Sequence, residues 1–374
     1  MDSRRPATGK ATHCAETTGM NIQLRRIGLT KRIPLTISRG TSAGSENLIV
    51  SVEHDGVTGI GEMAPTSGGA LAESADTAAA DFAVWTPLLE SCDPWEMQRI
   101  DTIIDLYGGG RASRAALDMA LHDWQGKRLG IPVWQLFGLD LDRIVPTSIT
   151  IGINPPDVLR EIVPEVLTRT GALAVKVKLG GPGGVEADQE RFAAAQAAAP
   201  YPVSWRVDAN GGWDVEPALA MIRWLARRGV EFVEQPLARG RESELPAIHH
   251  NSALPIYVDE SICVAGDIPP LSASIDGVNL KLMKSGGLRE ALRIVHVSRA
   301  HGLKLMMGCM SESSLAITAA AHLSPLADAL DLDSHLNLNP DPFVGAAYTQ
   351  GRVMPDAMPG LGVTFREAAT AIDL

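Results

Sequence analysis

The stretch ALAVKVKLGG, residues 172–181, combines the pattern of a buried strand with two lysines. Apolar residues alternate with Lys176 and Lys178, and because side chains alternate across a strand, both lysines project from the same face. Lysine is among the residues least often fully buried. Two lysines on one face of an apolar strand, just before a glycine pair, therefore indicate a functional site rather than a plain core strand.

Sequence on either side of this strand shows a regular alternation of strand and helix patterns. Short apolar runs recur through residues 143–342, and helical stretches separate them. The eight predicted strands cover residues 145–153, 172–179, 201–209, 229–235, 254–260, 276–282, 303–309 and 328–334. Eight strands alternating with helices predict an α/β fold with a parallel barrel of the (β/α)8 TIM type. An open doubly wound sheet is the alternative, and the even spacing favours the barrel.

The segments that flank the barrel predict a second, smaller unit. Strand patterns followed by helical ones predict an α+β capping domain over residues 21–142, with its clearest helix at 112–130. Residues 343–374 contain glycine and proline punctuation, and we expect them to return to this domain. Residues 1–20 lack the apolar core of a signal peptide and predict a disordered leader, with Met1 or Met20 as the start.

Composition and charge argue against several classes of partner. The 374 residues carry a formal net charge of -11 and a pI near 5.3, which argues against a nucleic acid or an anionic membrane. The four cysteines have no close pairing, so neither a zinc site nor a disulfide framework is indicated, and we expect a cytoplasmic protein. No apolar run reaches the ~20 residues of a membrane helix.

Acidic residues end three successive predicted strands. Asp208 ends the third strand, Glu234 the fourth and Asp259 the fifth, at intervals of 26 and 25 residues. One strand–helix unit of such a barrel has about that length, at ~250 residues over eight strands, and active sites lie at the carboxyl ends of the strands. We therefore expect the three carboxylates to meet. An all-oxygen ligand set suits Mg2+, with Mn2+ as a substitute.

Lysines occur on two predicted strands that face each other across the barrel. Lys178 lies on the second strand and Lys281 on the sixth. A substrate with its carboxylate on the metal would place its middle between them. Two bases that flank one carbon permit a 1,1-proton transfer, in which one removes a proton and the other returns it on the opposite face. A base must be neutral, and we expect Lys176 and the metal to lower the pKa of Lys178.

Five motifs resemble those of the enolase superfamily, in its muconate-lactonizing-type branch. They are KVK (Lys176, Lys178), DAN (Asp208), EQP (Glu234), DES (Asp259) and KLMKSGG (Lys281). The resemblance covers nearly the whole chain. It implies a modified (β/α)7β barrel, an N-terminal capping domain and a C-terminal return to the cap. It also implies that the three carboxylates bind Mg2+ and that Lys281, rather than Lys284, is the second base.

The DLDS motif of the last strand resembles that of the dipeptide epimerases within this family. The resemblance implies that Asp331 and Asp333 bind the free ammonium group of a dipeptide. It also implies that Thr150, Lys176 and Cys309 line the substrate site. We further expect a homo-oligomer.

The preferred side chain of the substrate is predicted from the capping loop ISRGTS, residues 37–42. Arg39 in this loop can take a side-chain carboxylate bidentately. We therefore expect Mg2+-dependent epimerisation at the α-carbon of the C-terminal residue of an acidic dipeptide, with L-Ala-D/L-Glu as the expected substrate.

Other activities are alternatives on the same scaffold: N-succinylamino acid racemase, o-succinylbenzoate synthase and muconate cycloisomerase. Their substrates carry no free ammonium group, so the D-x-D pattern argues against them. A mandelate-type racemase would need a His–Asp pair on the sixth and seventh strands, and Lys281 and the absence of a histidine near Cys309 argue against it. A barrel that binds a metal or a small acid without chemistry would lack a base or a ligand, and none is missing.

Overall fold

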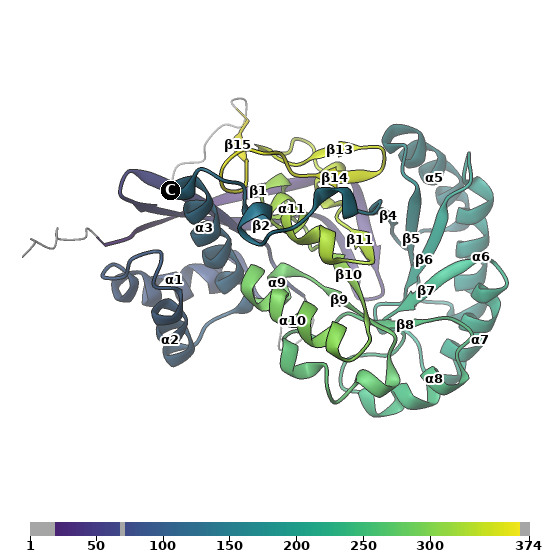
Figure 1. Cartoon of the computed structure of the whole chain (residues 1–374). Helices are drawn as coiled ribbons and strands as arrows, with labels where there is room; N and C mark the ends of the chain where they lie inside the picture. The colour runs from purple at the N-terminus through teal and green to yellow at the C-terminus, as the bar shows by residue number, and fades with distance from the viewer. Residues whose placement is uncertain (1–18, 68–71, 367–374) are drawn as a thin grey trace, which may run out of the picture.

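The computed structural model describes residues 19–67 and 72–366, so most of the predicted leader lies outside the described residues. A three-stranded antiparallel sheet and four helices form the cap, on the left of Figure 1. These elements are β1 (Asn21–Ile37), β2 (Gly40–His54), β3 (Val57–Met63), α1 (Ala75–Leu89), α2 (Met97–Tyr107), α3 (Arg111–Leu129) and α4 (Val133–Leu136).

Eight parallel strands follow, and each neighbours the next along the chain. They are β4 (Ser148–Ile151), β5 (Ala174–Lys178), β6 (Ser204–Asp208), β7 (Val230–Glu234), β8 (Ile256–Val258), β9 (Gly277–Leu280), β10 (Lys304–Gly308) and β11 (Ala329–Asp331). Thr147, which directly precedes β4, forms a parallel bridge with Leu330 of β11, and this bridge closes the ring. The predicted barrel is confirmed, and each predicted strand contains one observed strand.

Helices cover the outside of the barrel (Figure 1). They are α5 (Pro156–Thr170), α6 (Gly184–Ala198), α7 (Val215–Ala226), α8 (Leu245–Asn251), α9 (Leu282–Ser285), α10 (Leu288–Ala300) and α11 (Ser314–Leu323). No α-helix of the described chain follows β11, as the (β/α)7β pattern requires, and a short 3-10 turn at Ser334–Asn337 takes its place.

The C-terminal segment forms short strands and returns to the cap. Its strands are β12 (Phe343–Val344), β13 (Ala347–Thr349), β14 (Arg352–Met354) and β15 (Thr364–Phe365). The N–H of Leu361 donates to Asp123 of α3 at 2.7 Å, and the N–H of Val133 donates to the carbonyl of Gly360 at 2.9 Å. These contacts join the segment to the cap helices.

Close packing fixes α3 against the cap sheet. A Cβ at Gly61 of β3 would lie 2.0 Å from the carbonyl oxygen of Ala116, so only glycine permits this approach. The same helix holds the segment after β9, because Asp118 accepts from the N–H of Leu288 at 2.6 Å and pairs with Arg289 at 2.7 Å. The cap and the barrel are therefore joined at the start of α10, a few residues after Lys281.

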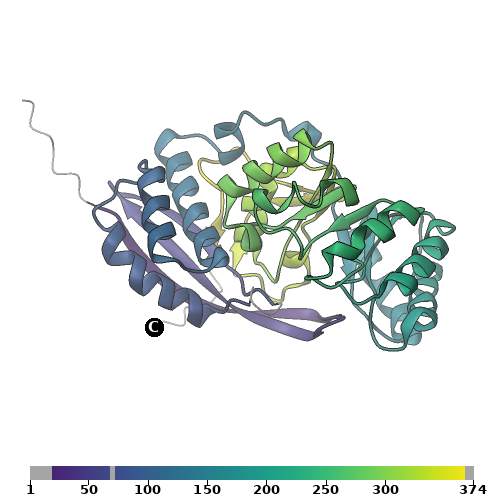
Figure 2. The same ribbon diagram turned by 90° about the horizontal axis from the view of Figure 1, so that it is seen from below.

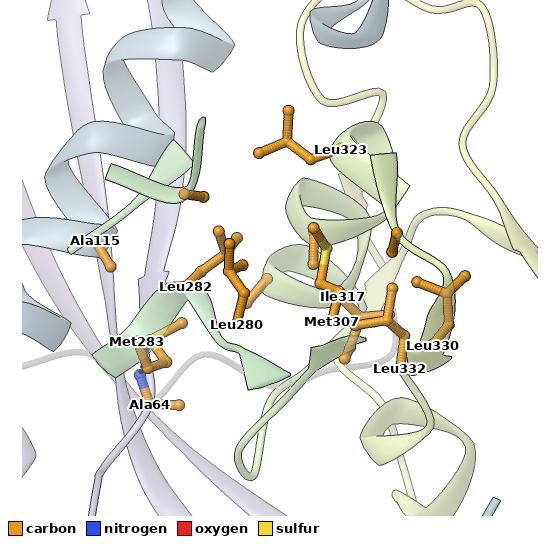
Figure 3. Packing of buried hydrophobic residues seen from close by; sticks show 14 of the residues in the cluster. Ala64, Ala115, Leu280, Leu282, Met283, Met307, Ile317, Leu323, Leu330 and Leu332 are labelled. Atoms are coloured by element: carbon orange, nitrogen blue, oxygen red, sulfur yellow. Dashed lines mark hydrogen bonds between the residues drawn. The ribbon is translucent and has the colours of Figure 1, made fainter. Parts of the chain in front are cut away.

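Buried side chains from β9, β10, β11 and α11 pack together inside the barrel wall (Figure 3). Met283 of α9 lies beside Ala64 of the cap, whose N–H donates to its Sδ at 3.3 Å. Leu282 and Met283 are both fully buried, so α9 is fixed on two sides. Fixing α9 also fixes the position of Lys281 at its start.

The β1–β2 ribbon extends from the cap helices along the barrel (Figure 2). The register of β1 against β2 shifts between Thr30 and Leu35, and here β1 contacts the segment after β11 instead. Lys31 bridges to Leu338, and the N–H of Ile33 donates to Asn337 Oδ1 at 3.0 Å. This shift brings residues of the cap onto the carboxyl ends of the barrel strands.

Candidate active site

Three carboxylates meet at the carboxyl ends of neighbouring strands. Asp208 ends β6, Glu234 ends β7, and Asp259 directly follows β8. All three are buried, and one oxygen from each lies within 4.8 Å of the others. Three buried carboxylates this close repel each other unless cations compensate them. The all-oxygen donor set fits a hard divalent cation such as Mg2+.

Neighbouring polar groups fix the carboxylates in place. Asn279 of β9 donates to Glu234 Oε1 at 2.6 Å, and the N–H of Asn210 donates to Asp208 Oδ1 at 2.7 Å. Asn210 and Gln235 follow these strands with φ of 44° and 38°, in the left-handed region that side chains seldom adopt. Such backbone geometry next to three converging carboxylates is typical of a functional site.

The two predicted bases contact this triad. Lys178 Nζ lies 2.5 Å from Asp208 Oδ2, and Lys281 Nζ lies 2.6 Å from Asp259 Oδ2. Burial alone would lower the pKa of Lys281, but the carboxylates of Asp259 and then Glu234 outweigh it and raise the pKa. Lys178 ends β5 and Lys281 directly follows β9, on the opposite side of the barrel, and both side chains line the same cavity.

Lys176 is fully buried below this place and does not line the cavity described below. Its ammonium lies 3.0 Å from Glu234 Oε2 and 3.9 Å from Asp208 Oδ2, and it also pairs with Asp331. Burial would lower the pKa of Lys176, but these carboxylates, Asp331 first, raise it well above its usual value. Lys176 therefore lies as a charge within the barrel, among the carboxylates, and its expected contact with substrate stays a prediction.

Asp331 and Asp333 differ in what they contact. Besides Lys176, Asp331 accepts from Ser148 Oγ at 2.7 Å and from Thr150 Oγ1 at 3.2 Å. Burial would raise the pKa of Asp331, but Lys176 and Lys178 lower it to about 2. Asp333 has no cation within 4.0 Å among the described residues and accepts the N–H of Thr150 at 2.6 Å.

The pKa of Asp333 is raised to about 6, first by burial and then by the charge of Asp331. Cys309 lies beside it, with its Sγ 3.2 Å from the carbonyl oxygen of Asp331 and 3.9 Å from Asp333 Oδ1. Burial, and then the charge of Asp333, raise the pKa of the Cys309 thiol well above its usual value. Asp333 is thus the carboxylate on this side that is free to meet a cation.

Arg39 contacts the barrel rather than facing the site unpaired. Its guanidinium donates to the carbonyl of Asn210 at 2.9 Å and pairs with Glu260 at 2.7 Å. Asn210 lies two residues after the metal-ligand candidate Asp208, and Glu260 directly follows the candidate Asp259. Arg39 therefore joins the capping loop to residues beside the carboxylate triad. Both terminal nitrogens of its guanidinium, which the sequence suggested for a substrate carboxylate, already have partners in the protein.

These groups surround one cavity of about 580 Å³ between the cap and the barrel. The predicted residues that line it are Arg39, Thr150, Lys178, Asp259, Lys281, Cys309, Asp331 and Asp333. Its apolar wall comes from both domains and includes Ile33, Leu35, Ile37, Ile149, Ile162, Val166, Met310 and Leu336. Most of the charged groups of the cavity thus come from the barrel, and much of its apolar lining comes from the cap and α5.

The sequence matches two family descriptions that together cover most of the chain. Residues 20–138 match "Mandelate racemase / muconate lactonizing enzyme, N-terminal domain", and residues 159–369 match "Enolase C-terminal domain-like". The chain belongs to the enolase superfamily. The resemblance that the motifs indicate is confirmed.

Similar members of this superfamily are dipeptide epimerases. The chain is 50% identical to the hydrophobic dipeptide epimerase of Roseobacter litoralis (93% of this chain, 100% of the relative) and 45% identical to that of a Flavobacteria bacterium (93% and 99%). It is 36% identical to the L-Ala-D/L-Glu epimerase of Bacteroides thetaiotaomicron (88% and 83%). The structure of the dipeptide epimerase of Enterococcus faecalis with Mg and L-Leu-L-Tyr superposes with a TM-score of 0.85, at 29% identity (94% and 100%).

The sequence did not indicate the contacts that Lys284 and Gln235 make in this enolase-superfamily site. Lys284 lies 2.8 Å from Asp259 Oδ1 and donates to the carbonyl of Asp259, so Asp259 has two ammonium partners. Gln235 accepts the N–H of Asp259 at 2.8 Å. Gln235 directly follows Glu234, and Lys284 lies shortly after Lys281. Their position next to strand ends was the only sign in the sequence that they belong to the site.

Proposed function

We propose that this protein is a Mg2+-dependent dipeptide epimerase that inverts the α-carbon of the second residue, and that this residue carries an apolar side chain. The observation that carries the proposal is the arrangement of Lys178 and Lys281, which reach one cavity from opposite sides of the barrel beside the carboxylate triad. Two bases on opposite faces of one carbon are what inversion by proton removal and return requires.

In this proposal the metal site formed by the triad binds the carboxylate of the substrate. Asp208, Glu234 and Asp259 would hold Mg2+, which offsets the carboxylate charges that raise the pKa of Lys281 and stabilises the charge that develops as the α-proton leaves. Lys178 and Lys281 then flank the α-carbon next to that carboxylate. One ammonium and one amine at any moment allow one lysine to take a proton while the other gives one.

In this proposal Asp333 binds the ammonium group of the substrate. It lies on the β11 side of the cavity, lacks a cationic partner among the described residues, and stands beside Thr150 and Cys309. A dipeptide spans ~7 Å when extended, at ~3.3–3.6 Å per residue, which suits a molecule held at its two ends. An N-acylated amino acid lacks the ammonium, and so leaves the half-buried Asp333 without a cationic partner.

The apolar wall supports an apolar side chain on the epimerised residue. Ile33, Leu35 and Ile37 come from the cap strand β1 and line the cavity together with residues of α5. The carboxylate specificity first expected rested on Arg39, which is engaged by Glu260. The names of the relatives at 50% and 45% identity point the same way.

A panel of dipeptides in deuterated buffer with Mg2+ tests the proposal. L-Ala-L-Leu and L-Ala-L-Phe are expected to epimerise with uptake of one deuterium at the second α-carbon, and faster than L-Ala-L-Glu and L-Ala-L-Lys. Mass spectrometry reads the uptake and chiral chromatography the epimer. Turnover of N-succinylamino acids in preference to every dipeptide would contradict the proposal.

A further inference from the structure

Lys31 differs from the other cations that line the cavity. Each of those has a carboxylate within 4.0 Å, and they are Arg39, Arg169, Lys178, Lys281 and Lys284. Lys31 pairs with no carboxylate of the described residues, and its Nζ donates to Ser42 Oγ at 3.0 Å. Lys31 is half-buried, and burial lowers its pKa. A partly desolvated ammonium without an anion favours a carboxylate that arrives with the substrate.

The backbone around Lys31 is fixed to the barrel beside β11. The register shift in β1 releases residues 31–34 from β2, and Lys31 bridges to Leu338 instead. The N–H of Asn339 donates to the carbonyl of Thr30 at 2.9 Å, so the residue before Lys31 is also held. Lys31 therefore occupies a defined position on the wall of the cavity, beside the segment that follows β11.

This position is on the ammonium side of the cavity. Lys31, Cys309 and Asp333 line the same cavity, and the backbone around Lys31 contacts Asn337 and Leu338, which follow Asp333 in the chain. Cys309 Sγ in turn lies 3.9 Å from Asp333 Oδ1. Lys31 and Asp333 form no ion pair with each other, so both charges on this wall of the cavity remain available to a substrate.

We propose that Lys31 binds a side-chain carboxylate on the first residue of the dipeptide, so that the enzyme prefers L-Glu or L-Asp at that position. The inference rests on the proposed function and adds the identity of the first residue. Each charge of such a substrate then has one partner: Asp333 for the ammonium, Lys31 for the side-chain carboxylate, and the triad site for the terminal carboxylate. The second residue remains apolar against the wall that the cap supplies.

The test compares L-Glu-L-Leu with L-Gln-L-Leu, which differ by one charge at nearly equal shape. Wild-type enzyme is expected to show a kcat/KM about tenfold higher for L-Glu-L-Leu, equivalent to about 1.4 kcal/mol. Lys31→Met should reduce this ratio to about one, and Lys31→Arg should retain most of it. Because the ratio is measured within each variant, a general loss of activity does not imitate the effect.

Arg32→Gln is the matched control, because Arg32 is the exposed cation next along β1, does not line the cavity and contacts only the backbone of Leu338 there, at 3.1 Å, so the variant removes a charge outside the cavity. It should keep the wild-type ratio. A wild-type ratio near one, or a ratio that persists in Lys31→Met, would overturn the assignment of Lys31 while L-Ala-L-Leu turnover still supports the proposed function. If wild-type enzyme epimerises neither L-Ala-L-Leu nor the test pair, the proposed function and this inference both fall.

Discussion

Lys281 Nζ lies 2.6 Å from Asp259 Oδ2, so one proposed base directly contacts one proposed metal ligand. The base and the metal site therefore share a carboxylate, and the charge of each depends on the other. Burial would raise the pKa of Asp259, but Lys281 and Lys284 lower it well below its usual range, so the carboxylate is ionised at any working pH.

Removal of the metal should abolish epimerisation. Exhaustive chelation should reduce activity by at least 100-fold, and added Mg2+ should restore it, because three buried carboxylates would otherwise hold both lysines as ion pairs. Asp259→Asn should also weaken Mg2+ binding measured by calorimetry, which does not depend on turnover. Full activity of chelated, dialysed enzyme would contradict this account.

Asp331→Asn and Asp333→Asn should have different effects. Asp333→Asn should raise KM for dipeptides by about 10- to 150-fold, the equivalent of 1.5–3 kcal/mol for a lost charged hydrogen bond, with little change in thermal stability. Asp331→Asn should also lower the melting temperature, because it removes a carboxylate from the buried Lys176. Differential scanning calorimetry beside steady-state kinetics separates the two. Equal losses of stability would refute the distinction.

The pH dependence of dipeptide binding should follow the ionisation of the Asp333 carboxyl group. Its pKa is about 6, and it must be ionised to bind an ammonium, so binding is complete above that pH and weakens as pH falls through it. The ratio of kcat/KM for L-Ala-L-Leu to that for N-acetyl-L-Ala-L-Leu should therefore decrease about tenfold per pH unit below 6. The ratio cancels the titration of the lysines. Asp333→Asn should make it independent of pH.

Arg39→Ala should weaken binding of every dipeptide to a similar extent. Arg39 joins the capping loop to Glu260 and to the carbonyl of Asn210, and it is about one-third exposed, so we expect an effect of up to ~1 kcal/mol, or about fivefold in KM. Glu260→Gln should give a similar loss. A selective loss of L-Ala-L-Glu turnover in Arg39→Ala would instead restore Arg39 as a specificity residue.

The sequence predicts residues at strand ends better than residues that meet across domains. Asp208, Glu234, Asp259, Lys178 and Lys281 follow apolar runs at intervals of about one strand–helix unit, and a closed barrel brings such positions together. Their positions therefore follow from periodicity and topology, and the motifs add their resemblance to a known family.

Other features depend on distances that periodicity does not contain. Lys176 differs from Lys178 by only two positions, yet barrel closure brings Lys176 to Asp331 and away from the cavity. Arg39 and Lys31 sit on the cap, so their partners depend on how the cap meets the barrel and on the register shift in β1. Neither relationship has a local sequence signal.

The central claim is that Lys178 and Lys281 act on opposite faces of one α-carbon. Exchange of the α-proton of L-Ala-L-Leu and of L-Ala-D-Leu with deuterated buffer, followed by NMR in Lys178→Ala and Lys281→Ala, tests it most directly. Each variant should lose epimerisation by about 10²–10⁴-fold yet exchange the proton of one epimer only, and the two variants should retain opposite epimers. Exchange of the same epimer by both variants, or near-normal epimerisation by either, would contradict the two-base arrangement.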